Sequence, residues 1–586
     1  MNGLLSGKDL EAVYADLLLG RAKLVGWGCI APFPYYFLTS PLVPEIMIDA
    51  DPGKWGKKFC GLPTLCPDVL AEMDTQDTIV MVYPIYSPEA VEQILSRIAQ
   101  YGPFRAIPPF HAPDHLPLLS SVLEHSRQAP VRDDGRLRIA VERTDRLALV
   151  SAQGLADAIR SARQFSRVKG AATPKRARLF IGRLQPGGAE RQLTYLARGL
   201  AASGWDSAVQ TFSPPLPGAE SYLMGATGFL HQILPSAREF LSPEETPDGL
   251  PPELTPISSV LRLLPLELIH YVAITYWSLI RERPFLVVSY LDVINVAVGI
   301  AALLAGVPHI LISGRNLNPT HFPNHYASAQ AWLKPCYEAL LCFPELHLSA
   351  NSAAGANSYC QWLDLPEDRV STVPNGLLDG MLPPMDWAAR TRLRKKLRIP
   401  IEALLIVGVF RLSDEKRPLL FVETAGLLLE EFPQAHVILV GDGPRRADVA
   451  AAIRELKEAA RFHMVGSRSD ATDVLGAADL VLHTAWAEGH PNVLMEAQLL
   501  ERPIVCTASH GTAECLYTSS VIRVEDTADP ALLARSAAAI LLDAAEAARA
   551  ASPARAWLLD RFSIARLVTN SLKAADIPQL DIMEVC

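Results

Sequence analysis

The sequence predicts an α/β protein made of Rossmann-like domains, in which parallel strands alternate with helices that cover both faces of each sheet. Short apolar runs typical of buried strands are followed repeatedly by stretches with helical spacing of apolar residues, which favours doubly wound parallel sheets. Paired glycines stand at two strand-to-helix turns, at Gly26 and Gly28 and again at Gly187 and Gly188. The 586 residues allow about three to four domains of ordinary size.

Composition excludes several classes of protein. Hydrophobic residues make up 49% of the chain and charged residues 20%, which indicates a globular rather than a disordered protein. The net charge of −9 and the lack of a long basic run argue against a nucleic-acid partner. The nine cysteines form no C-x-x-C pair and no signal peptide is evident, so a cytoplasmic protein with free thiols is expected. The most apolar helical stretch, Leu261–Ile280, contains charged residues and is interpreted as a packed helix.

Residues 1–110 are predicted to form a smaller Rossmann-like domain. One strand runs into a glycine turn that fits a loosened G-x-G-x-x-A pattern ending at Ala31, and the next strand ends in an acid where a ribose would be bound. The same fold without a bound dinucleotide remains an open alternative. The D-x-D that ends at Asp51 is interpreted as a turn. The candidate ligand residues are Gly26, Gly28 and Asp49.

Residues 111–175 are rich in Pro, Arg and Asp and are predicted to be a linker with helices, including one over 151–168. We therefore expect the N-terminal domain to be separable. A chain beginning near Ala171 should still fold and bind its ligand.

Two larger α/β domains are predicted over 176–385 and 386–586. In the first, strands are expected over 177–182, 207–212, 285–290, 309–313 and 346–350, and helices over 189–203, 293–305 and 326–342. In the second, a basic helix over 387–397 precedes strands over 404–409, 436–440, 462–465, 480–484, 504–507 and 521–524, and a last helix is expected over 553–574. The six regularly spaced strands make the last domain the clearest in the chain.

The stretch from Glu488 to Glu496 carries the strongest functional signal. It follows the apolar run Leu480–Ala485 and opens a helix with Pro491, whose missing N–H costs nothing at a first turn. A helix start offers unpaired amides and the positive end of the helix dipole to an anion. Carboxylates on both sides of that start can hold a sugar and a ribose on either side of a diphosphate. The amides expected to bind the anion are those of Asn492, Val493 and Leu494.

Together these features resemble the large retaining glycosyltransferase family 4, also described as glycosyl transferases group 1, whose fold is GT-B. The resemblance covers residues from about 177 to 575 and leaves the N-terminal domain as an extension. The motifs that carry it, in the family's order, are Gly187-Gly-Ala-Glu-Arg191, Val373-Pro-Asn-Gly376, Arg411 with Lys416, Gly441-Asp-Gly-Pro444, and Glu488 with Glu496. Ser289-Tyr-Leu291, Asn295 and Ser313-Gly-Arg-Asn316 resemble a subgroup of that family. His490, Phe410 and Gly314 depart from the family's pattern, and no first-domain histidine is matched, which leaves the acceptor-side chemistry open.

The resemblance implies a role for each matching residue. Arg411 and Lys416 would hold the donor diphosphate, Glu488 would contact the donor sugar, and these are the candidate catalytic residues. Preorganised cations and amides can stabilise a leaving diphosphate without a metal. The other implied donor-side residues are Glu496 at the ribose, Gly187 and Gly188 beside the diphosphate, and Gly466 near the base; the implied acceptor-side residues are Arg315 and Asn316.

The expected function is transfer of a hexose, with retention, from a UDP- or GDP-linked donor to a glycan or lipid-linked acceptor. Surface polysaccharide or glycoconjugate synthesis is the expected setting, with no cofactor required and peripheral contact with the inner face of a membrane left open. Two alternatives use the same fold: a sugar-nucleotide epimerase and a non-enzymatic nucleotide-sugar sensor.

Overall fold

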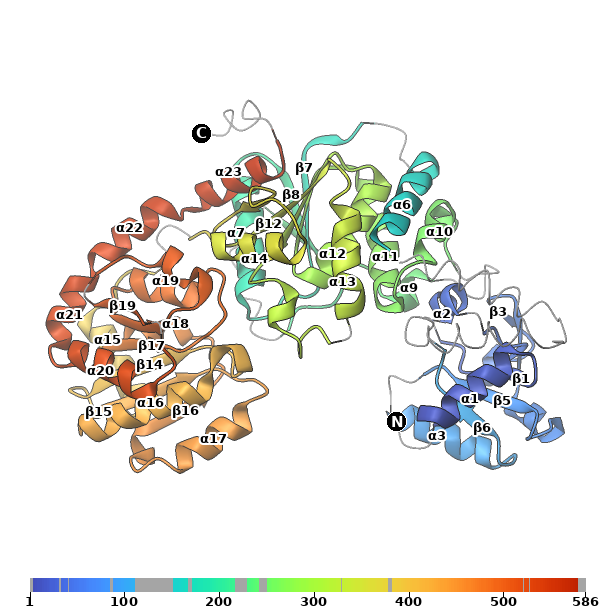
Figure 1. The fold of residues 1–586 in the computed structure, drawn as a ribbon, viewed down its shortest axis with the longest axis horizontal. Coiled ribbons are helices and arrows are strands. Elements are labelled where there is room, and N and C mark those ends of the chain that lie inside the picture. Colours follow the sequence, from blue (N-terminus) through green and yellow to red (C-terminus); the bar gives the residue numbers. More distant parts are fainter. Residues whose placement is uncertain are drawn as a thin grey trace.

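Three domains follow one another along the chain, each with its own mainly parallel sheet (Figure 1). The N-terminal domain lies at one end of the molecule, the second in the middle and the third at the other end. The predicted α/β class is confirmed, whereas the exact domain boundaries stay predictions. The computed structural model describes residues 4–30, 33–40, 42–84, 88–110, 151–166, 171–216, 229–241, 250–327, 329–377, 382–519, 521–525 and 527–577.

The N-terminal sheet has the strand order β3-β4-β2-β1-β5-β6, and its strands are parallel except for the β3–β4 hairpin. The predicted strand Thr78–Val82 is β5, and every residue in it is buried. The other strands are β1 (Lys23–Trp27), β2 (Ile46–Ile48), β3 (Lys58–Phe59), β4 (Leu62–Leu65) and β6 (Arg105–Ile107), and the helices are α1 (Gly7–Leu18), α2 (Phe33–Thr39) and α3 (Pro88–Ala99).

The N-terminal domain docks on the second domain through α2, which packs against α11 (Leu266–Glu282). The Tyr35 hydroxyl lies 3.0 Å from Nδ1 of His270, and burial lowers the pKa of this histidine to about 4. α11 contains most of the apolar stretch that was interpreted as a packed helix. Within the described parts of the chain, no helix is both long and apolar enough to cross a membrane.

The second domain has a fully parallel sheet with the order β13-β12-β11-β10-β7-β8-β9. Its strands are β7 (Thr173–Ile181), β8 (Asp206–Thr211), β9 (Leu230–Ile233), β10 (Pro284–Tyr290), β11 (His309–Gly314), β12 (Leu346–Ala350) and β13 (Val370–Thr372). Besides α11, its helices are α7 (Gly188–Ala202), α9 (Ala237–Phe240), α10 (Ser258–Leu261), α12 (Asp292–Ala305), α13 (Gln330–Leu340) and α14 (Ala353–Trp362).

Helix α6 (Ala152–Ser166) lies in the predicted linker but packs into the core of the second domain, against α12 and α13. Leu155 and Ile159 are buried in the same hydrophobic cluster as the residues of those helices. The Ser166 hydroxyl also donates a hydrogen bond to the Leu304 carbonyl at 3.0 Å. A chain that begins near Ala171 therefore lacks part of this core, so the expectation that it folds has to be revised.

The third domain has a fully parallel sheet with the order β16-β15-β14-β17-β18-β19. Its strands are β14 (Leu404–Val409), β15 (Ala435–Val440), β16 (Phe462–Gly466), β17 (Leu480–His483), β18 (Ile504–Thr507) and β19 (Ile522–Glu525). Its helices are α15 (Trp387–Lys396), α16 (Pro418–Glu431), α17 (Arg446–Arg454), α18 (Ala471–Gly476), α19 (Asn492–Leu499), α20 (Pro530–Leu541) and α21 (Ala544–Ala551).

The helix expected over 553–574 is two helices, α22 (Pro553–Arg561) and α23 (Ile564–Ala574). The break falls where the Ser563 side chain caps α23 and the Leu377 amide donates to the Phe562 carbonyl at 2.6 Å. α22 contacts α19 of the third domain, whereas α23 packs on α7 of the second domain (Figure 1). Helix α23 thus returns to the second domain.

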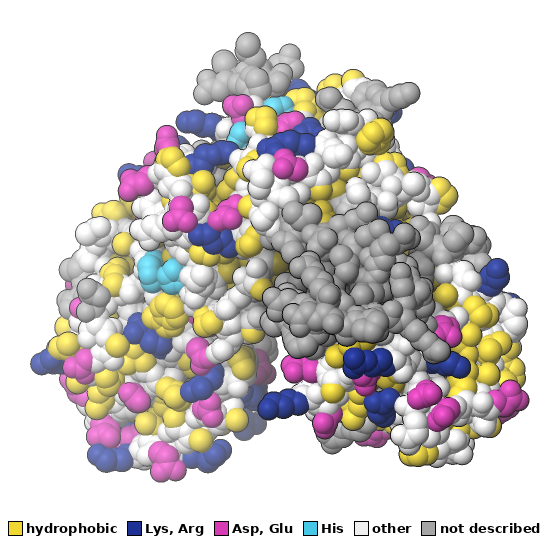
Figure 2. Space-filling model, turned by 45° about the vertical axis from the view of Figure 1, so that its right-hand side comes forward, with side chains coloured by type: hydrophobic (Ala, Val, Ile, Leu, Met, Phe, Trp, Pro, Cys, Tyr) yellow, Lys and Arg dark blue, Asp and Glu magenta, His cyan; other side chains and the backbone are white. Residues whose placement is uncertain are grey.

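Charged side chains are mixed on the molecular face that Figure 2 shows. Lysines and arginines lie beside aspartates and glutamates across this face. The described residues of the face form no extended patch of one charge. The expected absence of a nucleic-acid partner stays a prediction.

Candidate active site

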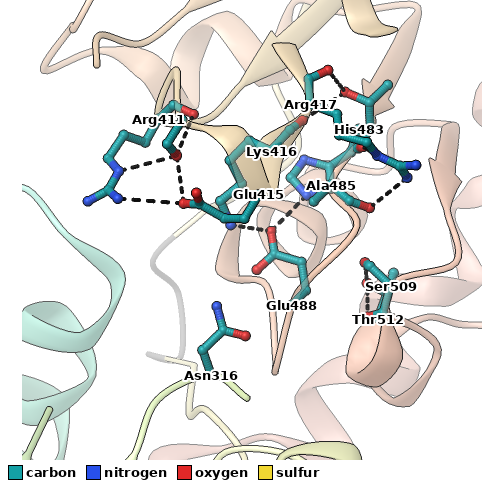
Figure 3. Close-up of polar contacts among 12 residues, drawn as sticks. Asn316, Arg411, Glu415, Lys416, Arg417, His483, Ala485, Glu488, Ser509 and Thr512 are labelled. Carbon is teal, nitrogen blue, oxygen red and sulfur yellow. Dashed lines mark hydrogen bonds and ion pairs between the residues drawn. The ribbon is translucent and has the colours of Figure 1, made fainter. Parts of the chain in front are cut away.

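The candidate active site lies between the second and third domains, where loops that follow parallel strands meet. Ligands of α/β proteins bind at the carboxyl ends of such strands. Glu488 follows β17, and Arg411 follows β14. Asn316, which follows β11 of the second domain, lies opposite Glu488 (Figure 3).

Glu488 is the centre of a buried group of charges. Its Oε1 accepts hydrogen bonds from Lys416 Nζ at 2.5 Å and from His483 Nε2 at 2.9 Å (Figure 3). Burial by itself raises the pKa of the Glu488 carboxyl, but the ammonium and the imidazole outweigh it and lower this pKa to about 2. Glu488 is therefore ionised at neutral pH and suited to accept hydrogen bonds from hydroxyl groups.

Arg411 and Lys416 share one loop but differ in exposure. The Arg411 side chain is 56% exposed, and its Nη2 lies 3.6 Å from Oε1 of Glu415. The Lys416 side chain is only 17% exposed and is held by Glu488. Figure 3 shows the Arg411 guanidinium extending away from Glu488. Arg411 is thus the more accessible cation, and Lys416 couples the loop to the central carboxylate.

The Gly441-Asp-Gly-Pro motif packs against the loop that follows β14. Gly441 and Gly443 have φ angles of +145° and +159°. A Cβ atom at these positions would collide with the carbonyl oxygens of Phe410 and Leu412. The Leu412 amide also donates to the Asp442 carbonyl at 3.0 Å. The glycines are therefore needed so that two loop backbones can pack directly on each other.

Two departures from the family's pattern have a packing reason. Phe410 fills the space between Phe421, at 5.4 Å between ring centroids, and His483, at 5.8 Å. Any side chain at Gly314 would collide with the Tyr359 ring. An acid is therefore excluded at that position by its neighbour.

The helix start at α19 is only partly free for an anion. The Leu494 amide donates to the Pro491 carbonyl at 3.2 Å, which corrects the expectation that it is an unpaired donor. Tightening of the first turn causes this bond. The Asn492 side chain accepts hydrogen bonds from Gln192 and Asn375 of the second domain, both at 3.0 Å. Asn492 thus ties the helix start to the second domain, and Val493 follows it within α19.

Close neighbours, rather than unusual backbone angles, leave no room for a side chain at Gly187 and Gly188. Gly187 is extended, with φ −140°, and a Cβ there would meet the Glu190 carboxylate. A Cβ on Gly188 would lie 2.6 Å from the Asn492 side-chain nitrogen. The glycine turn therefore lies directly against the start of α19.

Glu496 is buried and forms an ion pair with Arg191 of α7, across the domain boundary. The sequence placed both residues in motifs but did not foresee that they meet. His490 is also buried, and burial, followed by the charge of Arg315, lowers its pKa to about 3. Its carbonyl accepts a hydrogen bond from Asn375 at 2.6 Å. These contacts hold the two domains together beside α19.

Arg315 lies over the Tyr290 ring, 4.1 Å from its centroid, and donates a hydrogen bond to Asn375 Oδ1. Its side chain is thus held by residues of its own domain, whereas its neighbour Asn316 faces Glu488 (Figure 3). Of the two predicted acceptor-side residues, Asn316 is the one that the structure places opposite the central carboxylate.

Gly466 ends β16 with a φ of +71°, and its carbonyl accepts a hydrogen bond from the Gly441 amide at 3.0 Å. Gly466, which was predicted to lie near the nucleotide base, is therefore hydrogen-bonded to the glycine motif that packs against the loop of Arg411.

The candidate ligand residues of the N-terminal domain form hydrogen bonds or packing contacts with other residues of that domain. The Asp49 carboxylate accepts hydrogen bonds from the Cys29 amide at 2.8 Å and Lys54 Nζ at 3.0 Å. Gly28 has φ +100° and lies against Pro84, while Gly26 lies against Met47. Asp51 caps the short turn after β2 by accepting from the Gly53 amide, in line with its interpretation as a turn. Ala31 lies outside the described residues.

His483 is the site residue that sequence reasoning missed. The only signal was a histidine within the otherwise apolar start of the run Leu480–Ala485. In the structure its side chain is 2% exposed and bonded to Glu488.

Comparison with solved structures identifies the fold of the second and third domains. The crystal structure of Anabaena Alr3699/HepE in complex with UDP and glucose is similar, with a TM-score of 0.55 and 21% identity over 68% of this chain and 99% of that chain. Another similar structure is that of WaaG, described as a glycosyltransferase involved in lipopolysaccharide biosynthesis, with a TM-score of 0.50 and 19% identity over 68% of this chain and 99% of that chain. The second and third domains have the GT-B fold.

A family model matches part of the third domain. Residues 402–543 match the family model of glycosyl transferases group 1. The third domain is thus a group 1 glycosyltransferase domain, as the resemblance implied.

One curated relative is the Vi polysaccharide biosynthesis protein VipC/TviE of Salmonella typhi, 28% identical over 58% of this chain. Another is a UDP-Gal:alpha-D-GlcNAc-diphosphoundecaprenol alpha-1,3-galactosyltransferase of Escherichia coli, 26% identical over 41% of this chain. The chain spans 60% of the first relative and 62% of the second.

Proposed function

We propose that the protein is a retaining glycosyltransferase that moves a hexose from a UDP- or GDP-sugar to a glycan or lipid-linked acceptor in surface polysaccharide or glycoconjugate synthesis. The observation that carries the proposal is the ionised Glu488 carboxylate of the third domain. It is hydrogen-bonded to Lys416 and faces Asn316 of the second domain. Such a carboxylate can accept hydrogen bonds from the hydroxyls of a sugar placed between the domains.

The proposed donor is a nucleoside-diphosphate sugar. Arg411 extends from the same loop as Lys416, so the loop can oppose the negative charge that grows on a departing diphosphate. The similar Anabaena protein was crystallised with UDP and glucose, which supports UDP among the possible nucleotides. The proposed chemistry needs no metal, because the cationic side chains can stabilise the negative charge on the diphosphate.

Curated relatives support the proposed acceptor and pathway. One is named for Vi polysaccharide biosynthesis, and another for galactosyl transfer to a diphosphoundecaprenol-linked sugar. These relatives favour a transferase over an epimerase or a sensor. The cytoplasmic location and contact with the inner face of a membrane stay predictions.

The test is turnover of a panel of UDP- and GDP-sugars by the full chain, measured as nucleotide release with and without EDTA. We expect one donor to be turned over, at the same rate in EDTA. Glu488→Gln should abolish release because an amide cannot replace the ionised carboxylate. A panel with no turnover would remove the transferase proposal, and loss of activity in EDTA that magnesium or manganese restores would remove metal independence alone.

A further inference from the structure

His483 interrupts the apolar sequence of a central strand. β17 reads Leu-Val-Leu-His, and all four residues are buried. The His483 side chain is only 2% exposed, and its ring packs edge-on against Phe410 at 5.8 Å. Burying an imidazole is unfavourable unless its nitrogens are hydrogen-bonded. The residue therefore needs a reason beyond packing.

The reason is the contact with Glu488. The His483 Nε2 lies 2.9 Å from Glu488 Oε1, the same oxygen that Lys416 Nζ contacts at 2.5 Å. An ionised carboxylate only accepts hydrogen bonds, so the proton lies on Nε2 of the imidazole. Figure 3 shows the second carboxylate oxygen pointing away from both donors, on the side of Asn316. Two donors thus fix one oxygen and leave the other for a ligand.

We propose that His483 is a positioning residue, which holds Glu488 so that its second oxygen is presented to a hydroxyl of the donor sugar. This inference rests on the proposed function. His483 itself does not touch the substrate, because β17 places it behind Glu488.

Lys416 cannot supply this restraint alone. Its ammonium is a compact charge on a flexible stem, with three donors that it can share among several acceptors. When a diphosphate binds beside the loop, Lys416 can turn one or more of these donors towards the phosphate oxygens. The rigid imidazole of His483, wedged against Phe410, then keeps the Glu488 oxygen in place.

The experiment compares three variants of the full chain on the sugar nucleotide that it turns over fastest. His483→Phe keeps the aromatic packing and removes the donor, His483→Gln keeps an N–H near the position of Nε2, and Glu488→Gln is the reference for complete loss. Loss of one hydrogen bond to a charged group should lower the kcat of His483→Phe roughly ten- to hundredfold. The KM for the donor should change little, and His483→Gln should recover most of the kcat.

The pH profile is the readout that a merely structural histidine would not alter. The groups that face Glu488 are the Lys416 ammonium and the His483 imidazole, and its charge is also felt by the buried thiols of Cys506 and Cys515. Removing the imidazole raises the pKa of Glu488, so activity that needs ionised Glu488 is lost at a higher pH. The acid limb of kcat should therefore move upwards in His483→Phe and return in His483→Gln.

Each outcome decides one question. Normal kcat and an unmoved acid limb in His483→Phe, with inactive Glu488→Gln, would overturn the role of His483 while leaving the proposed function in place. Normal activity of Glu488→Gln, or no turnover by the unaltered chain, would overturn the proposed function itself. If His483→Phe does not fold by circular dichroism, His483→Asn takes its place, because the shorter amide cannot reach Glu488 Oε1, and the same limb shift is required of it.

Discussion

At the scale of single residues, the two cations of the loop after β14 differ in their surroundings. The resemblance to the family assigned both Arg411 and Lys416 to the donor diphosphate. Lys416 is partly buried and contacts Glu488, so replacing it disturbs the central carboxylate as well as any diphosphate contact. Arg411 is largely exposed; its Nη2 lies 3.6 Å from Oε1 of Glu415, and its Nε donates a hydrogen bond to the Ser413 hydroxyl at 3.3 Å. Arg411 is therefore the cleaner probe of diphosphate binding.

We expect Arg411→Ala to lower kcat by roughly 10²–10³ because a preorganised donor to the leaving group is lost. Arg411→Lys should recover only part of this, since an ammonium lacks the planar fork that grips two oxygens. Steady-state nucleotide release measures both. Arg454→Ala is the matched control, because Arg454 is an exposed arginine on α17 of the same domain. Near-normal kcat in both Arg411 variants would mean that the diphosphate is held elsewhere.

The sequence located much of the candidate site but not its internal contacts. Glu488 could be singled out because it stands between a buried strand and a helix start, whereas Lys416 was named only because the resemblance to the family implied its role. The ion pair between Arg191 and Glu496 could not, because its partners come from different domains and no local pattern links them. His483 was missed because a lone histidine in a strand has no recognisable spacing.

At the scale of secondary-structure elements, long apolar strands were predictable and short edge strands were not. β12 and β14 have the predicted bounds: β14 is a continuous run of apolar residues and glycine, and β12 alternates apolar and polar residues before the polar Asn351. β9, with two exposed apolar residues, and β13, with three residues, lie at the two edges of their sheet and carry no such run. The break between α22 and α23 depends on tertiary contacts at Phe562, which helical periodicity cannot register.

Helix α6 gives a prediction about where the chain can be divided. A chain that begins at Ser151 should be folded, because it keeps α6 and with it the buried Leu155 and Ile159. A chain that begins at Ala171 should lose several kcal/mol of stability, since burying each large aliphatic side chain contributes about 1.5–3 kcal/mol. Thermal unfolding followed by circular dichroism compares the two. Equal melting temperatures would show that α6 adds nothing to this core.

At the scale of the whole molecule, the second and third domains meet through complementary charges. The Glu514 carboxylate of the third domain accepts hydrogen bonds from the amides of Ala353 and Ala354, at 2.7 Å and 2.9 Å. These amides begin α14 of the second domain, so the carboxylate also lies at the positive end of a helix dipole. The contact favours the arrangement in which the domains are close together.

We expect Glu514→Ala to weaken this contact by about 1–2 kcal/mol and to shift the chain towards more open arrangements. Small-angle X-ray scattering should then give a larger radius of gyration than for the unaltered chain. Glu546→Ala is the control, because Glu546 pairs only locally with Arg549 on the exposed side of α21. Identical scattering curves for Glu514→Ala and the unaltered chain would show that this pair does not govern the domain arrangement.

The return of the chain to the second domain determines how the two large domains can move. In the described residues the polypeptide crosses between them near Leu377 and near Ser563, and these two residues pair through an isolated parallel β-bridge. One crossing would act as a swivel, whereas two adjacent crossings act as a hinge with a single line of bending. Atoms beside such a line travel least. His490, whose ring lies 4.9 Å from that of Phe562, lies beside this hinge line, so the loop from Glu488 to Pro491 can keep its shape while the more distant rims of the two domains open.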